Sequence, residues 1–253
     1  MFSVLNIVTA SALAVLGFIL GPLGCRILNK IPAKWLCDYN ETPSEELLGG
    51  NRYKVKPTGI IMGAVLAAAM FSTAIVTGLK ATLPCVVLLY AVMLLIAASD
   101  AKYTIIPDQF TIAVAVISLI FAAVDFFTGK NFITSWYSPL LGAAVGGGVL
   151  LGLDLLSTLV FKKEGFGFGD VKLMAALGLM LGLKYIIILL LLSAFAAAIH
   201  FLYLIFAGKA KKGIYLPMGP YICIGTVFTM LLQPYFEGIF KMYKMLLEME
   251  VLP

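Results

Sequence analysis

Three aspartates lie at the borders of long apolar runs. Asp100 ends one such run, and Asp108 opens the next one directly after Pro107. Asp170 follows the glycine-rich segment Gly165–Gly169 and opens another. A carboxylate near the centre of a membrane helix costs about 2.5–3.5 kcal/mol on insertion scales, so acids kept at the border indicate a role there. Two carboxyls on one face could act as general acid and general base toward a bound water.

The composition predicts a polytopic helical membrane protein. Of the 253 residues, 62% are hydrophobic and only 12% are charged, whereas soluble domains carry about 25% charged residues. The mean hydropathy is +1.04. In such a chain the net charge of +5 records topology and contact with anionic headgroups rather than nucleic-acid binding.

We expect an all-α bundle of about eight transmembrane helices. At about 20 residues a span, the apolar runs place them at 3–23, 58–79, 82–99, 107–127, 139–161, 170–183, 184–207 and 215–235. With the N-terminus outside, all but five of the 18 lysines and arginines fall in inner loops, as the positive-inside rule requires. The three aspartates at the span borders then face the cytosol.

Three regions follow from this division. Residues 1–57 hold the first span and a polar cytosolic loop, residues 58–235 the core, and residues 236–253 an amphipathic tail. The loop carries Trp35 and Tyr53 among its charges, which favours packing against the membrane over a free linker.

The two ends of a helix differ electrostatically, and this difference separates the aspartates. Asp170 would lie at a helix N-terminus, where the dipole favours a carboxylate, and the glycines before it accept a positive φ. Asp100 lies at a C-terminal end, which favours its protonated form. We therefore predict Asp100 as the acid and Asp170 as the base. Plain helix capping is the alternative for Asp170 and is favoured for Asp108.

Other polar residues have simpler interpretations. Asp154, inside the fifth span, is expected to pair with a polar group or a lysine, and His200 to be a buried, hydrogen-bonded imidazole. Asp125, near an outer helix end, is expected to be solvated. The run Gly142–Gly148 predicts close helix packing by small residues.

Four segments in order resemble the type IV prepilin peptidases, GxGD-type membrane aspartyl proteases. They are Asp100 with Ile106-Pro107-Asp108, the stretch Lys163–Leu173 around Gly167-Phe168-Gly169-Asp170, Leu216–Tyr221 with its Pro-Met-Gly-Pro, and more weakly Gly21–Pro32. The resemblance implies Asp100 and Asp170 as catalytic residues. The remaining positions that match the family's segments would support them: Asp108, Gly167, Gly169, Lys172, Pro217, Gly219 and Pro220.

The resemblance implies an endopeptidase of the inner (cytoplasmic) membrane. Its substrate would be a type IV prepilin or pseudopilin, whose short basic leader is cut off on the cytosolic side without metal or cofactor. Glu41, Glu45 and Glu46 could attract that leader, although a solvated surface is the favoured interpretation. Related GxGD proteases act on other substrates, such as preflagellins. A transporter that couples ions through membrane carboxylates is the alternative from another class.

The cysteines depart from the family pattern. Larger members carry two CxxC pairs in the first cytosolic loop, in a zinc-supported region linked to N-methylation, whereas this loop has only Cys25 and Cys37. The sequence therefore predicts no metal site. It leaves open whether the chain uses S-adenosylmethionine to methylate the new N-terminus. The oligomeric state is likewise open.

Overall fold

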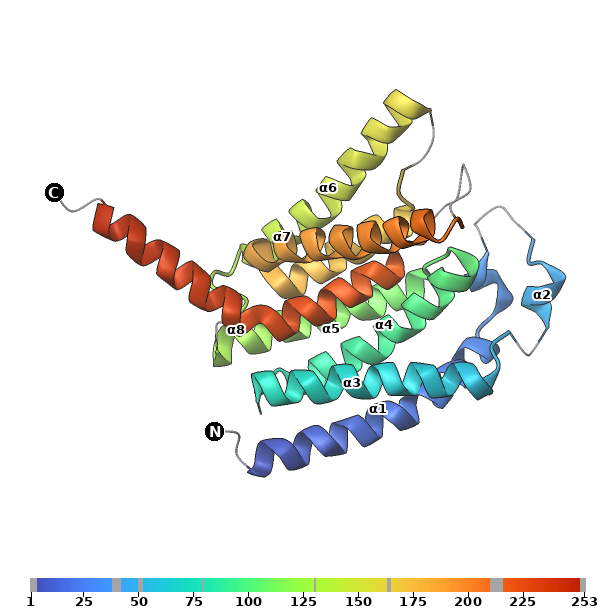
Figure 1. Cartoon of the computed structure of the whole chain (residues 1–253), viewed down its shortest axis with the longest axis horizontal. Helices are drawn as coiled ribbons and strands as arrows, with labels where there is room; N and C mark the ends of the chain where they lie inside the picture. The colour runs from blue at the N-terminus through green and yellow to red at the C-terminus, as the bar shows by residue number, and fades with distance from the viewer. Residues whose placement is uncertain are drawn as a thin grey trace.

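The computed structural model describes residues 4–37, 42–49, 52–78, 80–129, 131–162, 165–209 and 216–250. Glu41, Lys163 and Glu164 of the sequence analysis lie outside these residues. Within them the chain is helical (Figure 1). The helices are α1 (Val4–Lys30), α2 (Glu45–Leu48), α3 (Ile60–Thr77), α4 (Leu83–Tyr103), α5 (Asp108–Thr128), α6 (Ser138–Phe161), α7 (Phe168–Phe206) and α8 (Gly219–Glu250), with short 3-10 and π turns at Ala33–Leu36 and Val55–Gly59.

Seven of the described helices are long and apolar enough to cross a membrane. The longest, α7, is broken at Gly182, whose φ of +66° and ψ of 178° end one helix and begin another. The chain folds back there, so that the two parts of α7 lie side by side (Figure 1). They correspond to the predicted spans 170–183 and 184–207. The predicted polytopic helical bundle is therefore confirmed, with two of its predicted spans joined in one folded-back element.

Small residues allow α6 to approach α7 closely. A Cβ on Gly142 would lie 2.3 Å from the Gly178 carbonyl oxygen, and one on Gly146 would lie 2.7 Å from that of Met174. Only glycine permits backbones this near to each other. The predicted packing role of the glycine run is thus confirmed at these positions, while Gly148 faces open space.

The core lies between α4, α5, α7 and α8. Its fully buried members include Leu89 and Ile96 of α4, Val114 of α5, and Leu173 and Leu177 of α7. The first half of α7 is therefore surrounded by other helices, which fixes the position of its N-terminal turn. That turn carries Asp170.

The polar loop after α1 packs against the ends of α1 and α4. Arg52 is buried and donates hydrogen bonds to the carbonyls of Leu47, at 2.8 Å, and Ile31, at 2.7 Å. The Tyr53 hydroxyl donates to the Ala98 carbonyl at 2.9 Å, and burial raises the pKa of this phenol. Lys102 of α4 pairs with Glu46 at 2.9 Å, while the Glu46 side chain stays 67% exposed.

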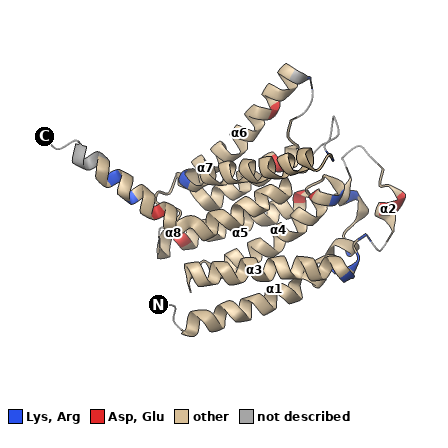
Figure 2. Ribbon diagram, viewed as in Figure 1, with Lys and Arg blue, Asp and Glu red and all other residues tan. Residues whose placement is uncertain are grey.

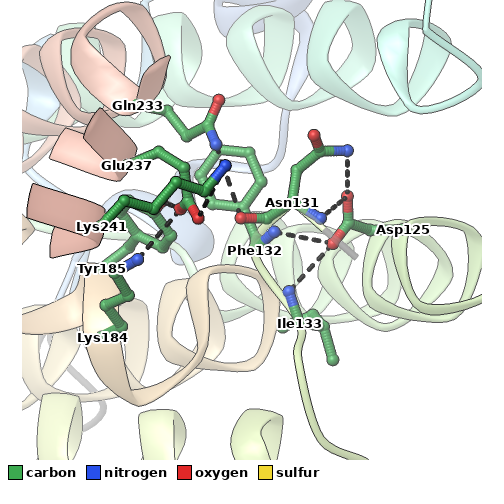
Figure 3. A network of polar contacts seen from close by, with 9 residues as sticks. All are labelled: Asp125, Asn131, Phe132, Ile133, Lys184, Tyr185, Gln233, Glu237 and Lys241. Atoms are coloured by element: carbon green, nitrogen blue, oxygen red, sulfur yellow. Dashed lines mark hydrogen bonds and ion pairs between the residues drawn. The ribbon is translucent and has the colours of Figure 1, made fainter. Parts of the chain in front are cut away.

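A polar network occupies the opposite end of the bundle (Figure 3). Asp125 is only 1% exposed and accepts hydrogen bonds from the backbone N–H groups of Phe132, at 2.8 Å, and Ile133, at 2.9 Å. The expectation of a solvated Asp125 was wrong, because its carboxylate caps the turn between α5 and α6. Beside it, Lys184 pairs with Glu237 at 3.0 Å.

Two further expectations need correction. His200 is exposed on the bundle surface rather than buried, although its ring does hydrogen-bond to the Tyr221 hydroxyl. The tail does not form a separate helix, because α8 continues through Pro234 to Glu250. Residues 236–250 therefore prolong the helix of the last predicted span.

Candidate active site

The predicted site residues meet at one end of the bundle. α4 ends there, while α5, α7 and α8 begin there, so that residues far apart in sequence become neighbours. Charged residues lie mainly toward the helix ends and leave the middles apolar (Figure 2). The site is therefore at a border of the apolar layer, as the sequence predicted.

Asp100 lies in the last turn of α4 and is 4% exposed. Its Oδ2 accepts a hydrogen bond of 2.7 Å from the backbone N–H of Gly219, the first residue of α8. A Cβ at residue 219 would lie 2.7 Å from the same oxygen. Only glycine there lets the α8 backbone approach the carboxyl, and the adjacent Pro217 and Pro220 flank this turn.

Asp170 lies in the first turn of α7 and is also 4% exposed. Its carboxyl interacts electrostatically with that of Asp100 and hydrogen-bonds to the backbone of Gly167. Its Oδ1 has no hydrogen-bond partner among the described residues. The helix begins at Phe168 with Gly167 as its N-cap residue, so Asp170 is the third residue of the helix rather than the N-cap itself.

Asp108 forms an ion pair across the cleft. Its Oδ1 lies 2.8 Å from the Nζ of Lys172, and the two side chains are about one third exposed. Asp108 is the first residue of α5, and Pro107 stands at the N-cap position before it. The pair joins the N-terminal turns of α5 and α7, the latter being the turn that holds Asp170.

The glycines before Asp170 act through size rather than through a positive φ. Gly167 has a φ of −70° and a ψ of 142°, an extended conformation open to other residues. A Cβ on Gly169 would lie 3.1 Å from Cβ of Ile106. The expected left-handed turn is therefore absent at Gly167 and Gly169, and close contact with the loop after α4 explains Gly169.

A cleft of about 830 Å³ opens over the two aspartates. Its walls include Ile105 from the loop between α4 and α5, Phe168 from the start of α7, and Lys34 and Trp35 from the polar loop after α1. Sequence reasoning missed Lys34 and Trp35 as site residues. The available signal for these two residues was the aromatic Trp35 inside a loop rich in basic residues.

Asp154 of α6 contacts the glycine loop. Its Oδ1 accepts hydrogen bonds from the backbone N–H groups of Gly165, at 2.8 Å, and Phe166, at 3.0 Å. The expected polar partner is therefore the backbone just before Asp170. Sequence reasoning did not connect Asp154 to the site.

No group of three or more histidine, cysteine, aspartate or glutamate side chains that could hold a metal ion occurs in the part of the chain that the structure describes. Cys25 is buried with its Sγ 3.4 Å from the Met62 sulfur, and Cys37 contacts the Lys34 carbonyl. The groups lining the cleft that could bind a metal ion include the carboxyls of Asp100, Asp108 and Asp170, the Cys37 thiol and the Thr104 hydroxyl.

The fold and the site define a polytopic helical membrane protein with two carboxyls beneath one cleft, the arrangement of an acid–base site. The family model described as the type IV leader peptidase family matches residues 87–202. This stretch contains Asp100, Asp108 and Asp170. Over this stretch the chain is similar to the type IV leader peptidase family, the family that its motifs predicted.

Curated relatives agree with this assignment. The chain is 34% identical over 125 residues to the prepilin leader peptidase/N-methyltransferase of Xanthomonas campestris pv. campestris, which is 49% of this chain and 42% of that protein. The Aeromonas hydrophila protein of the same name is 33% identical over 137 residues, 54% of this chain and 45% of the relative. The Bacillus subtilis protein of the same name is 28% identical over 183 residues, which is 71% of this chain and 67% of the relative. The chain spans less than half the length of the first two. No solved structure matches the chain.

Proposed function

We propose that this chain is a membrane aspartyl endopeptidase that removes the short basic leader of type IV prepilins or pseudopilins. The observation that carries the proposal is the convergence of Asp100 and Asp170 beneath one cleft at a helix-end border. The match to the type IV leader peptidase family supports the substrate class. The acids lie at one end of the bundle rather than near the midplane where transporter sites usually lie, which argues against ion-coupled transport.

The mechanism needs one ionised and one protonated carboxyl. The unpartnered Oδ1 of Asp170 takes a proton from water while the water oxygen bonds to the scissile carbonyl carbon. Asp100 gives its proton to the carbonyl oxygen, forming a neutral diol. Asp170 then gives its proton to the leaving nitrogen, the C–N bond breaks, and Asp100 recovers a proton from one hydroxyl. Both residues return to their starting states.

The other site residues keep this pair in place. Gly219 binds one oxygen of Asp100 and leaves the other for the substrate. The Asp108–Lys172 pair and the small Gly169 hold the N-terminal turn of α7 against the loop after α4. Preorganised polar groups of this kind contribute through geometry, because they need no rearrangement during the reaction.

The position of the cleft fits a substrate with a basic leader before an apolar helix. The apolar helix would lie in the lipid while the leader enters the cleft from the side predicted to face the cytosol. On this proposal the enzyme lies in the inner membrane. We propose that residues 58–235 form the peptidase core and that the loop within residues 1–57 closes the cleft through Lys34 and Trp35.

The test is cleavage by the purified protein in lipid, read by the intact mass of a prepilin. We expect wild type to release a leader ending at a glycine before the apolar helix, and Asp170→Asn to release none while remaining folded. Failure of folded wild type to cleave any prepilin or pseudopilin would overturn the proposal. Ion-dependent uptake into proteoliposomes would instead support the transporter.

Methylation is a separate part of the proposal. The relatives' names include N-methyltransferase, and we infer that S-adenosylmethionine is the methyl donor if the activity is retained. Adding S-adenosylmethionine to the same cleavage reaction tests whether the methyltransferase activity is retained. A product heavier by one methyl group would support retention, and an unchanged mass would limit the function to cleavage.

A further inference from the structure

We propose that Asp154 is a positioning residue for the proposed peptidase, holding the glycine loop that places Asp170. This inference rests on the proposed function for its catalytic consequence. Its structural basis, the contact between α6 and the loop, is independent of that function.

The contact joins two consecutive amides to one oxygen. Asp154 Oδ1 accepts from the N–H of Gly165 at 2.8 Å and from that of Phe166 at 3.0 Å. Hydrogen bonds to a charged acceptor are about twice as strong as neutral ones. The loop is thus fixed on α6 four residues before Asp170.

A second contact brings the same loop onto α6. A Cβ on Gly165 would lie 2.8 Å from Cβ and 2.9 Å from Oγ of Ser157, one helical turn beyond Asp154. Glycine therefore lets the loop backbone lie directly on this face of the helix. Phe166 then packs against the core, and Gly167 begins the turn that holds Asp170.

The surroundings of Asp154 make this role specific. The residues around it, Leu151, Leu153, Leu155 and Leu156, are exposed apolar side chains. This end of α6 leans away from the other helices (Figure 1). An acid in such an apolar segment has a high insertion cost, which indicates function when the acid binds polar groups. The polar groups bound here belong to the backbone leading to Asp170.

The test compares Asp154→Ala and Asp154→Asn with wild type. Asp125→Asn is the matched control, because one oxygen of Asp125, Oδ2, also accepts two consecutive backbone N–H groups, at the opposite end of the bundle. Three quantities are measured: amide hydrogen exchange of residues 165–166, kcat and KM for prepilin cleavage, and the thermal midpoint.

We expect Asp154→Ala to speed exchange at residues 165–166 and to lower kcat by about 10- to 100-fold with little change in KM, because small misplacements of reacting groups have effects of this order. Asp154→Asn keeps an acceptor oxygen, so its exchange rate and its kcat should lie between those of wild type and Asp154→Ala. Asp125→Asn should lower the thermal midpoint without a selective loss of kcat.

Unchanged exchange in Asp154→Ala would overturn the proposal, as would unchanged kcat despite faster exchange. A kcat loss explained by a lowered thermal midpoint, as in Asp125→Asn, would reduce Asp154 to a stabilising residue. If wild type does not cleave, the proposed function fails. The exchange measurement would still decide whether Asp154 holds the loop.

Discussion

At the scale of single residues, Gly219 is the position where one added methyl group should affect the chemistry most directly. Its Cβ in Gly219→Ala would lie 2.7 Å from Asp100 Oδ2, so the carboxyl or the start of α8 must move. We expect kcat for cleavage to fall on the order of 100-fold. Gly148→Ala is the control, since nothing lies within 4 Å of a Cβ there. Equal rates for wild type and Gly219→Ala would show that this contact does not matter.

The Asp108–Lys172 pair makes a second prediction at this scale. Lys172→Met should lower kcat by about tenfold through loss of alignment, but change the free energy of unfolding by less than about 1 kcal/mol, because the pair is partly exposed. Lys184→Met breaks a pair of similar length and exposure at the opposite end of the bundle. It should leave kcat unchanged. If both variants lose activity equally, the Asp108–Lys172 pair has no special role in the site.

At the scale of helices, the contact of α6 with α7 depends on glycine. In Gly178→Ala the new Cβ would lie 2.2 Å from the Gly142 carbonyl oxygen. Overpacking of this kind destabilises by about 1–3 kcal/mol, which a lowered thermal midpoint in detergent would report. Gly152→Ala, with open space around it, should match wild type or exceed it slightly. A Gly178→Ala protein as stable as wild type would contradict the observed packing.

Helix positions could be predicted from the sequence, whereas contacts between helix ends could not. Apolar runs report local burial in lipid, which is why the span ending near Asp100 and the short span before Gly182 were recognisable. The bond from Gly219 to Asp100 joins residues on two different helices and depends on how those helices pack side by side. The burial of Asp125 was misjudged for a different reason, because the sequence does not reveal that the following turn folds back onto this carboxylate.

The site residues divide in the same way into those that the sequence could predict and those that depend on folding. Residue types and order indicated Asp100 and Asp170 because carboxylates at apolar borders are unusual. The sequence did not show that Lys34 and Trp35 form a wall of the cleft, because nothing local reveals where a polar loop folds. Asp154 was noticed for its charge, but its partner lies across the turn between α6 and α7.

At the scale of the whole molecule, the orientation predicted from the basic residues can be tested directly. Thr128 and Lys209 are both exposed. Thr128 is the last residue of α5, whose first residue lies at the site, and Lys209 follows the end of α7. In variants without other cysteines, Thr128→Cys should react with an impermeant thiol reagent added to intact cells, and Lys209→Cys only after lysis. The reverse pattern would place the aspartates outside and contradict cleavage on the cytosolic side.

The central claim is that Asp100 and Asp170 act together on one water. The most direct test is single-turnover prepilin cleavage by Asp100→Asn, Asp170→Asn and the double variant, each with its thermal midpoint recorded. Residues that act as one unit are strongly non-additive. We therefore predict that either single change abolishes cleavage and that the double change is no worse, with folding preserved. Substantial cleavage by a folded single variant would contradict the account.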